Sequence, residues 1–501
     1  MANQSQSLFR LIHSLTQSEK RYFTMATRTQ SDSTAYLKVF KSIDQQEVYD
    51  EAQLKQQLSD QSFVKHLSVI KVQLYHFLLR TLRNYHESRS VDFRLKELMM
   101  DAAILNEKAL YNESGAIVHR ARELAMKYED WKVLLEILHK EYTLASVTVE
   151  PKQLEKVLSR INADEKRFIS QLNNYGELAY LALSLSMLLK KHRNAKNVSK
   201  NPAIKKVMTH PLLKYEKAAI SFRAKSLFYY IWSSYYMATC QFEKAEQHLT
   251  QQISSYQQHR HFLQAAPGNY LGALNDLLLS RYRTGQYEVV SQMIDQLKKL
   301  PDSNEIKRVT SRRFRMVIFS WTFKTEIGVA IKTHMQEQHL PGIQQQELFF
   351  NRHSTVMEPR RRLETLLALA TMYFLLHERR KSVQLIERLL QDDAATVHHE
   401  LNVLARTLQV VLHYDDGGFD VLDYLVSGLK RFVARQKETS RMEKQLLEFS
   451  GKLQNLHRKK NPAIFYQDQF KKFSVLKNDR FEKHQFDYFD VSEWLKKKLK
   501  Q

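Results

Sequence analysis

Apolar residues recur at helical spacing from the start of the chain. Leu8, Leu11, Ile12 and Leu15 open the pattern. This period of three to four residues predicts amphipathic helices that each bury one face. The first 90 or so residues divide in this way into five helices, of which the fifth runs from about Val64 to Glu87. Its apolar stripe comprises Ile70, Leu74, Phe77, Leu78, Leu82 and Tyr85.

Two of these predicted helices begin with capping signals. TQSE, from Thr16 to Glu19, matches a capping box, in which the hydroxyl and the carboxylate each accept a backbone N–H. Asp50, in YDEAQLKQQL, is the expected N-cap of the fourth helix. On the fifth helix, Lys71 lies on the polar side, so we expect its side chain to be exposed.

A second pattern begins near residue 95. In four windows a small or apolar residue is followed 12 positions later by another. Small residues let two helix backbones approach closely, so this spacing predicts helical hairpins whose arms meet at these positions. The pairs are Ala102/Ser114, Ser233/Ala245, Leu278/Val290 and Ala370/Ser382. The short joints between the two arms are ALYNES, CQFEKA, GQYEVV and HERRKS.

This pattern resembles the tetratricopeptide repeat (TPR), most closely in YYIWSSYYMATCQFEKAEQHL and LLALATMYFLLHERRKSVQLI. The resemblance implies an all-α, αα-hairpin (TPR-like) solenoid with an N-terminal helical bundle. The chain departs from the family at Leu278, where a small residue is usual. The first pair members are also 131, 45 and 92 residues apart, whereas the family period is about 34. Further hairpins are therefore expected near 131–172, 175–220 and 309–340, and at 396–435, where Gly417 and Gly418 end a helix.

Segments near both ends carry a second resemblance. LIHSLTQSEKRYF and FVKHLSVIKVQLYHFLLRTLRNYH near the start, and FDYFDVSEWL near the end, resemble a group of uncharacterised all-helical bacterial proteins of the Bacteroidota type. That resemblance implies a helical fold and a cytoplasmic location, and it implies no particular activity.

Changes in pattern and charge predict three parts. Residues 1–92 form the N-terminal bundle, 93–435 the TPR-like solenoid and 436–501 a basic C-terminal helical tail. HLPGI, which ends at Ile343, is expected to be a loop because of its proline and glycine. The tail ends in FDYFDVSEWLKKKLK, which predicts a short amphipathic helix. Its expected anchors are Phe489, Val491, Trp494 and Leu495.

The composition agrees with a helical chain. Its 501 residues include 11 glycines and 8 prolines, where average usage gives roughly 35 and 25. A single cysteine excludes an internal disulfide and a cysteine-based zinc site. The first residues do not have the pattern of a signal peptide. The most apolar run, LAYLALSLSMLL, is too short to span a bilayer, so we expect a cytoplasmic protein without a membrane span.

No motif in the sequence indicates catalysis. Cys240 and His248 are eight residues apart, but the hairpin pattern places the cysteine in a joint and the histidine on the second arm. A catalytic thiolate needs a base within hydrogen-bond reach, which that arrangement does not favour. Phosphate-binding glycine loops and the H-E-x-x-H zinc motif are absent. We therefore expect a non-enzymatic protein with no catalytic, cofactor-binding or metal-binding residues.

The net charge of +23 suggests an anionic partner. Basic residues gather in KKHRNAKNVSKNPAIKK, in KRVTSRRFR and in PRRR. Such clusters can attract an acidic protein segment or a phosphate backbone. The candidate contacts are Lys190, Lys191, Arg193, Lys196, Lys200, Lys205, Lys206, Arg308, Arg312, Arg313, Arg315, Arg360, Arg361 and Arg362.

Two functions follow from these patterns. The first is a non-enzymatic helical-repeat scaffold that binds a protein or peptide. The alternative is a nucleic-acid-binding or transcription-regulatory protein with a repeat sensor domain. Its N-terminal helix-turn-helix would expose Lys65, His66, Ser68 and Lys71 to DNA. The loop before these residues is longer than the usual turn of about 3–4 residues, so a bundle that caps the first repeat is favoured.

Overall fold

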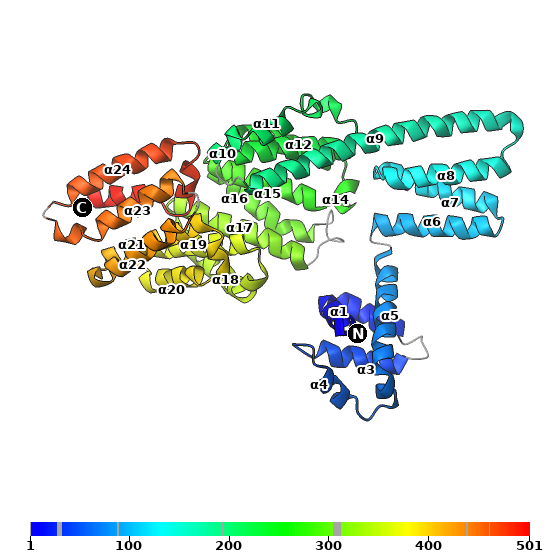
Figure 1. Cartoon of the computed structure of the whole chain (residues 1–501), viewed down its shortest axis with the longest axis horizontal. Coiled ribbons are helices and arrows are strands. Elements are labelled where there is room, and N and C mark those ends of the chain that lie inside the picture. The colour runs from blue at the N-terminus through cyan, green and yellow to red at the C-terminus, as the bar shows by residue number, and fades with distance from the viewer. Residues whose placement is uncertain are drawn as a thin grey trace. The chain divides into compact units, whose positions relative to one another are not determined.

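A computed structural model describes residues 2–27, 33–87, 90–191, 195–265, 267–303, 312–436, 439–459 and 461–500. Over these residues the protein is all-α and has no strand (Figure 1). The chain divides into two compact units, Met1–Leu172 and Asn173–Gln501. None of the described helices is both long and apolar enough to cross a membrane. The expected division at residues 92 and 435 stays a prediction.

The first unit begins with the five predicted helices, which are confirmed. A short 3₁₀ turn, η1, precedes the fifth helix. Leu8, Ile12, Phe23 and Leu74 form the centre of a shared apolar core. The elements are α1 (Ala2–Ser14), α2 (Gln17–Thr27), α3 (Ser33–Asp44), α4 (Glu51–Gln57), η1 (Ser62–His66), α5 (Leu67–Glu87), α6 (Val91–Glu107), α7 (Tyr111–Lys127), α8 (Trp131–Thr148) and the first half of α9 (Pro151–Lys191).

Both capping predictions are confirmed. The Thr16 backbone N–H donates to the Glu19 carboxylate at 2.7 Å, and the Glu19 N–H donates to the Thr16 hydroxyl at 3.3 Å. The Asp50 carboxylate accepts the N–H groups of the two residues that follow Glu51. These bonds satisfy backbone donors that a helix start leaves unpaired.

The prediction that Lys71 is exposed is wrong. Its side chain is 6 % exposed, and its ammonium group lies 2.6 Å from the Glu51 carboxylate and 3.1 Å from the Tyr49 hydroxyl. A buried lysine requires such partners, because an unpaired charge loses its hydration without compensation. Helical periodicity alone gave no sign of the partner on α4.

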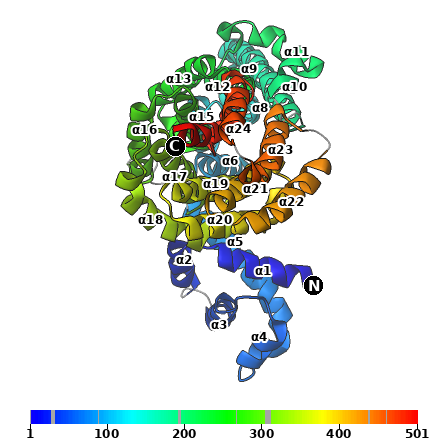
Figure 2. The same cartoon turned by 90° about the vertical axis from the view of Figure 1, so that its left-hand side faces the viewer.

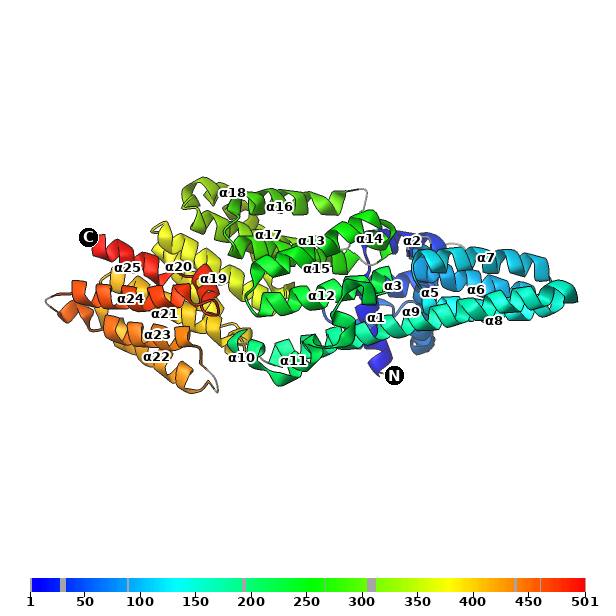
Figure 3. The ribbon, with the colours of Figure 1, turned by 90° about the horizontal axis from the view of Figure 1, so that it is seen from above.

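In the second unit, successive helices pack on one another in chain order (Figure 3). Its elements are α9 from residue 173 onward, α10 (Ala195–Lys200), α11 (Pro202–Met208), η2 (Pro211–Leu213), η3 (Glu216–Ala218), α12 (Phe222–Ala238), α13 (Phe242–Gln258), α14 (His261–Ala265), α15 (Pro267–Arg283), α16 (Tyr287–Lys299), η4 (Leu300–Asp302), α17 (Arg312–Lys332), α18 (Gln336–His353), η6 (Ser354–Val356), α19 (Pro359–Leu375), α20 (Arg379–Leu390), η7 (Asp393–Thr396), α21 (His399–Asp415), η8 (Phe419–Val421), α22 (Leu422–Ala434), α23 (Arg441–Leu453), η9 (Leu456–Arg458), α24 (Ala463–Asn478), η10 (Lys483–Asp487) and α25 (Val491–Lys500).

The 12-residue pairs lie in the core, as predicted. All eight members are almost fully buried. The Ser114 hydroxyl donates to the Ala102 carbonyl at 2.8 Å. The Ser382 hydroxyl makes the same bond to the Ala370 carbonyl at 2.7 Å. The two arms therefore approach closely enough for a serine on one to bond the backbone of the other.

The joints between paired helices share one backbone conformation. Among the described residues, each of seven joints contains a residue with positive φ. Its N–H bonds the carbonyl three residues back, and the next N–H bonds the carbonyl five residues back. This is the Schellman motif, which ends a helix and satisfies its last carbonyls. The residues are Ala109, Glu129, Cys240, Gly285, His334, His377 and Gly417.

The further expected hairpins are confirmed in part. Helices α21 and α22 pack together within 396–435, and the joint at Gly417 ends the first of them. Helices α17 and α18 meet at the joint at His334, inside the 309–340 window. The window 131–172 holds α8 and the first half of α9, which are linked by the contacts of Trp131 with Gln171 and of Glu141 with Arg160. The window 175–220 does not begin with a new helix, because α9 runs through the boundary between the two windows. Gly176 is the only glycine or proline between Pro151 and Pro202, so no strong break interrupts that helix.

The predicted loop at HLPGI is wrong, because Pro341 lies inside α18. Proline in a helix removes one backbone donor and normally bends or breaks the helix. Here Ile343 and Phe350 on the same helix are completely buried. Their burial favours the helix and outweighs the lost hydrogen bond.

The left-handed joints predict a stabilising substitution at Ala109, which is exposed and has φ of 58°. Glycine adopts this conformation without a Cβ clash. Ala109→Gly should therefore raise the free energy of unfolding by about 0.5–1 kcal/mol after the added chain entropy is counted. Ala116→Gly, on the exposed face inside α7, should lower it by about 1 kcal/mol. Urea unfolding of both variants measures the difference, and a loss of stability in Ala109→Gly would contradict the role given to the joint.

The close approach of helix arms predicts a cost for volume at Ala245, which is completely buried. Ala245→Leu should lower the free energy of unfolding by about 1–3 kcal/mol, because the added carbons have no space between α12 and α13. Gln251→Leu adds a similar side chain on the exposed face of the same helix and should leave stability nearly unchanged. Thermal unfolding compares the two, and equal effects would show that α12 and α13 do not meet at this position.

Candidate functional site

The structure places five candidate lysines together around the end of α9. Lys190 and Lys191 end α9, Lys200 ends α10, and Lys205 and Lys206 lie on α11. All five are exposed, and none has an acidic partner among the described residues. Their positive charges are therefore available to a partner. We call these five residues the lysine cluster.

The other candidates are distributed differently. Arg193 and Arg308 lie outside the described residues. Lys196, Arg312 and Arg313 have helical backbones. Arg315 is exposed and pairs with Asp302 at 2.8 Å.

The three arginines of PRRR point to internal partners. Arg362 holds Asp392 through two hydrogen bonds of 2.6 and 2.9 Å. Arg360 bonds Glu364 and Glu400. The Arg361 guanidinium lies 5.6 Å from the centre of the Trp321 ring. Arg360 and Arg362 are thus neutralised by carboxylates of the chain itself.

An apolar stripe on α9 leads into the lysine cluster. Tyr180, Leu183 and Met187 are 70 %, 68 % and 72 % exposed. Their spacing of three and four residues places them on one face of the helix. Lys190 and Lys191 lie three and four positions after Met187, so they extend the same face of the helix by one turn. We call Tyr180, Leu183 and Met187 the α9 stripe.

The opposite face of α9 accounts for the apolar run in the sequence. Leu178, Leu181, Ala182 and Leu185 are buried in a core shared with α10, α11 and α12. One face of the run therefore packs in the core, and the other is exposed to solvent within the described chain. Large exposed apolar side chains in a row are typical of a surface that another molecule covers. Tyr230 on α12, whose hydroxyl lies 3.1 Å from that of Ser186, extends this surface sideways.

The C-terminal segment, residues 483–500, covers the face of the array formed by α15, α17 and α19. Figure 2 shows α24 and α25 inside the curve of the neighbouring helices. The predicted anchors are confirmed, because Phe489, Val491, Trp494 and Leu495 are all buried. The Lys332 ammonium group donates to the Phe486 carbonyl at 2.9 Å across 154 positions of sequence. The C-terminal segment of the chain therefore fills this face of the array.

Glu364 is the centre of the contacts that hold this segment. Its carboxylate accepts the Tyr488 hydroxyl at 2.9 Å and Arg360 Nε at 3.0 Å, and Lys324 Nζ lies 3.3 Å away. Arg360 in turn reaches Glu400 on α21 at 2.7 Å. One buried carboxylate thus connects α17, α19 and α21 to the C-terminal segment.

The charge state of Glu364 depends on these partners. Burial alone would raise its pKa, but Lys324, Arg360 and Arg361 attract the carboxylate and lower its pKa to about 2. The Asp487 carboxyl, which lies 3.5 Å from Arg283, has the opposite balance. Burial raises its pKa despite the attraction of Arg283 and Lys332. The partners of Glu364 therefore favour its charged form, whereas burial opposes the charged form of Asp487.

Cys240 has the environment of a structural residue. It is buried at the α12–α13 joint with φ of 57° and packs with Phe242, Met237 and Phe481. Burial raises the pKa of its thiol, although Arg283 and other cations oppose that effect. A nucleophilic thiol needs a lowered pKa. His248 instead lies against the rings of Trp232 and Tyr236.

The sequence contained the signal for the α9 stripe but not for Glu364. The i, i+3 and i+7 spacing of Tyr180, Leu183 and Met187 is visible in LAYLALSLSMLL, a run whose length alone entered the prediction, as evidence against a membrane span. Glu364 follows three arginines in PRRRLE, and these neighbours alone predict a solvent-exposed carboxylate. Its partners Lys324 and Tyr488 are 40 and 124 positions away.

Glu364→Gln should lower the free energy of unfolding at neutral pH by about 3–5 kcal/mol, because it leaves buried cations without their anion. The effect depends on pH. The folded-state pKa is lowered from 4.5 to about 2, so the contribution of the carboxylate is complete above pH 4.5 and is lost as pH falls toward 2. Urea unfolding across that range should show the two proteins converging at low pH.

Glu337→Gln provides the matched control, because Glu337 is exposed on α18. It should leave stability unchanged at every pH. Equal stability of Glu364→Gln and the unaltered chain at neutral pH would contradict the central role of this carboxylate.

Comparisons with protein-family models, with curated proteins and with solved structures give no match to this chain. Its function therefore has to be inferred from its own geometry.

Proposed function

We propose that this chain is a cytoplasmic, non-enzymatic scaffold of TPR-like helical hairpins that binds a protein partner. The partner docks an acidic amphipathic helix on the exposed face of α9. The observation that carries this proposal is the α9 stripe, with its three large exposed apolar side chains in line with unpaired lysines.

The repeat assignment is supported by local geometry. In four hairpins the core pair lies seven residues before and five residues after the left-handed joint residue, as in Ala370, His377 and Ser382. A recurring hairpin with one joint and one close approach is the building unit of helical-repeat scaffolds. Such scaffolds present long helix faces to their partners.

The chemistry of the stripe selects the partner. Tyr180, Leu183 and Met187 match the apolar face of a second helix laid along α9, in the manner of helix packing. From residue 173 to 191 the only acidic residue is Glu177, and the two lysines lie at the other end. The remaining lysines lie on α10 and α11, which pack against α9 and add to its positive potential. An amphipathic helix with acidic flanks satisfies both features.

The nucleic-acid alternative has less support from the side chains. Lys71, one of the four residues expected to contact DNA, is buried against Glu51. Arg360 and Arg362 hold internal carboxylates. The lysine cluster remains able to attract phosphate, so this alternative becomes an outcome of the test.

A designed peptide tests the proposal directly. The probe is a fluorescent helix about five turns long with leucines along one face and glutamates elsewhere. The full-length chain should bind it saturably, as followed by fluorescence anisotropy. Leu183→Ser combined with Met187→Ser should weaken binding by about tenfold or more, because each buried apolar side chain contributes about 1.5–3 kcal/mol.

Leu348→Ser, at a position 63 % exposed on α18, is the control for general loss of surface apolarity and should leave binding unchanged. A scrambled peptide of the same composition, which has no apolar face, should not bind. Equal binding of the two peptides, or no effect of the α9 variants, would contradict the docking site. Tight binding of random DNA with a steep salt dependence would favour the alternative.

A further inference from the structure

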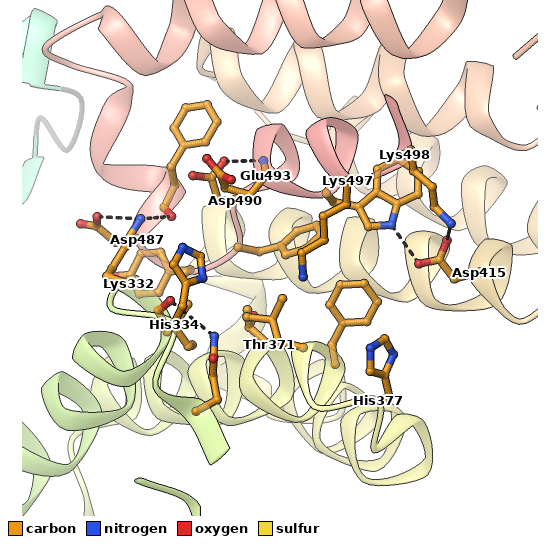
Figure 4. A pocket seen from close by; sticks show the side chains of 18 of the residues that line it. Lys332, His334, Thr371, His377, Asp415, Asp487, Asp490, Glu493, Lys497 and Lys498 are labelled. Atoms are coloured by element: carbon orange, nitrogen blue, oxygen red, sulfur yellow. Dashed lines mark hydrogen bonds and ion pairs between the residues drawn. The ribbon is translucent and has the colours of Figure 1, made fainter. Parts of the chain in front are cut away.

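A cavity of about 690 Å³ lies in the second unit beside the C-terminal segment (Figure 4). The joints at His334 and His377 contribute to its wall on one side, and η10 and α25 contribute on the other. Its apolar surface includes Phe374, Phe489 and Trp494. The volume is within the range of about 300–1,000 Å³ that is usual for small-molecule sites. This cavity is separate from the α9 stripe, and it shares Tyr488 with the contacts of Glu364.

Thr371 supplies a polar group inside the cavity. Its side chain is 2 % exposed, and its hydroxyl has no hydrogen-bond partner among the described residues. Other buried threonines in these helices, such as Thr365 and Thr407, donate to the carbonyl four residues back. A buried hydroxyl without a partner is costly unless something else bonds it. Thr371 instead lines the cavity (Figure 4).

The acidic side chains in the wall are already engaged. Asp490 and Glu493 share Lys477, at 2.8 and 3.4 Å. Asp415 accepts Trp494 Nε1 at 2.9 Å and lies 2.9 Å from Lys498. The fourth acid, Asp487, pairs with Lys332 and Arg283. Each of the four carboxylates therefore has at least one cationic partner, and Asp490 and Glu493 share theirs.

Lys497 differs from the other cations of the wall. Lys332, Lys477 and Lys498 each have an acidic partner, and Arg379 pairs with Asp416. Lys497 has none among the described residues, and its side chain extends from α25 toward the cavity (Figure 4). Lys497 is thus the cation of the described wall that has no ion-pair partner.

His334 and His377 place further polar groups in the wall of the cavity. His334 and His377 are exposed and have φ of 58° and 61° at their joints. Glycine would be the least strained residue at either position. Of the seven joint residues, these two line this cavity, and both are histidines.

We propose that this cavity binds a small organic anion, with an apolar or aromatic body and a single acidic group. The acidic group bonds the Lys497 ammonium, the body packs against Phe374, Phe489 and Trp494, and a polar atom of the ligand bonds the Thr371 hydroxyl. A ligand with several charges does not fit, because only one cation in the wall lacks a partner. This site would act independently of partner docking on α9.

The test uses two fluorescent probes of similar aromatic shape. Anilinonaphthalene sulfonate carries one negative charge, and phenylnaphthylamine is neutral. The full-length chain should bind the anionic probe at one saturable site and the neutral probe more weakly. Lys497→Gln should lower the affinity for the anionic probe by about tenfold, because a charge-assisted hydrogen bond is lost. It should leave the affinity for the neutral probe unchanged.

Two further variants separate binding from folding. Lys496→Gln changes an adjacent exposed lysine that does not line the cavity, and should bind both probes normally. Thr371→Val keeps the side-chain shape, so it should maintain or raise the Tm while weakening the binding of both probes, because both carry the amine N–H that would bond the Thr371 hydroxyl. Leu183→Ser combined with Met187→Ser should leave this site intact. Equal affinity for the two probes, or equal effects of Lys496→Gln and Lys497→Gln, would overturn the proposal.

Discussion

The arrangement of the helices depends on one backbone constraint, the left-handed residue at each helix joint. A chain with few glycines still has to reverse direction without leaving helix-end carbonyls unpaired. The Schellman bonds at the joints solve this, and five of the seven described examples use a residue that has a Cβ. The strain of about 1 kcal/mol or more at each such residue is accepted because the packing of both arms over-determines the turn. The joint fixes where Ala370 meets Ser382, and so fixes the hairpin.

Closure of the second unit requires a different interaction. Hairpins stacked in chain order leave an uncovered face, and the C-terminal segment covers it through residues more than a hundred positions from their partners. Glu364 is effective there because its carboxylate accepts donors from three directions in a buried site, where an unpaired charge would be expensive. The same closure leaves a cavity, since the aromatic residues of the segment and the two joints do not fill the space between them.

The sequence predicted what depends on local order. Helical period, the caps at Thr16 and Asp50 and the 12-residue pairs are all set by neighbours within a few turns, and they are confirmed. The pattern at Gly417 was harder to see, because its core pair is the larger Val410 and Leu422. Long-range partners were not predictable. Lys71 and the α9 stripe each look like ordinary members of an amphipathic helix, and only the three-dimensional contacts show that the lysine is buried and the stripe is bare.

The contrast between these surfaces limits where a partner can bind. The face covered by the C-terminal segment is satisfied, with its anchors buried and its carboxylates paired, so a peptide that replaced the segment would first have to break those contacts. The α9 stripe has no such competitor among the described residues, and its lysines lose no internal bond when they meet an acidic partner. The proposed docking on α9 would therefore require none of these contacts to break first. The C-terminal segment occupies its own face of the array, whereas α9 has buried apolar residues on one face and exposed ones on the other, which is why we propose that a partner docks there.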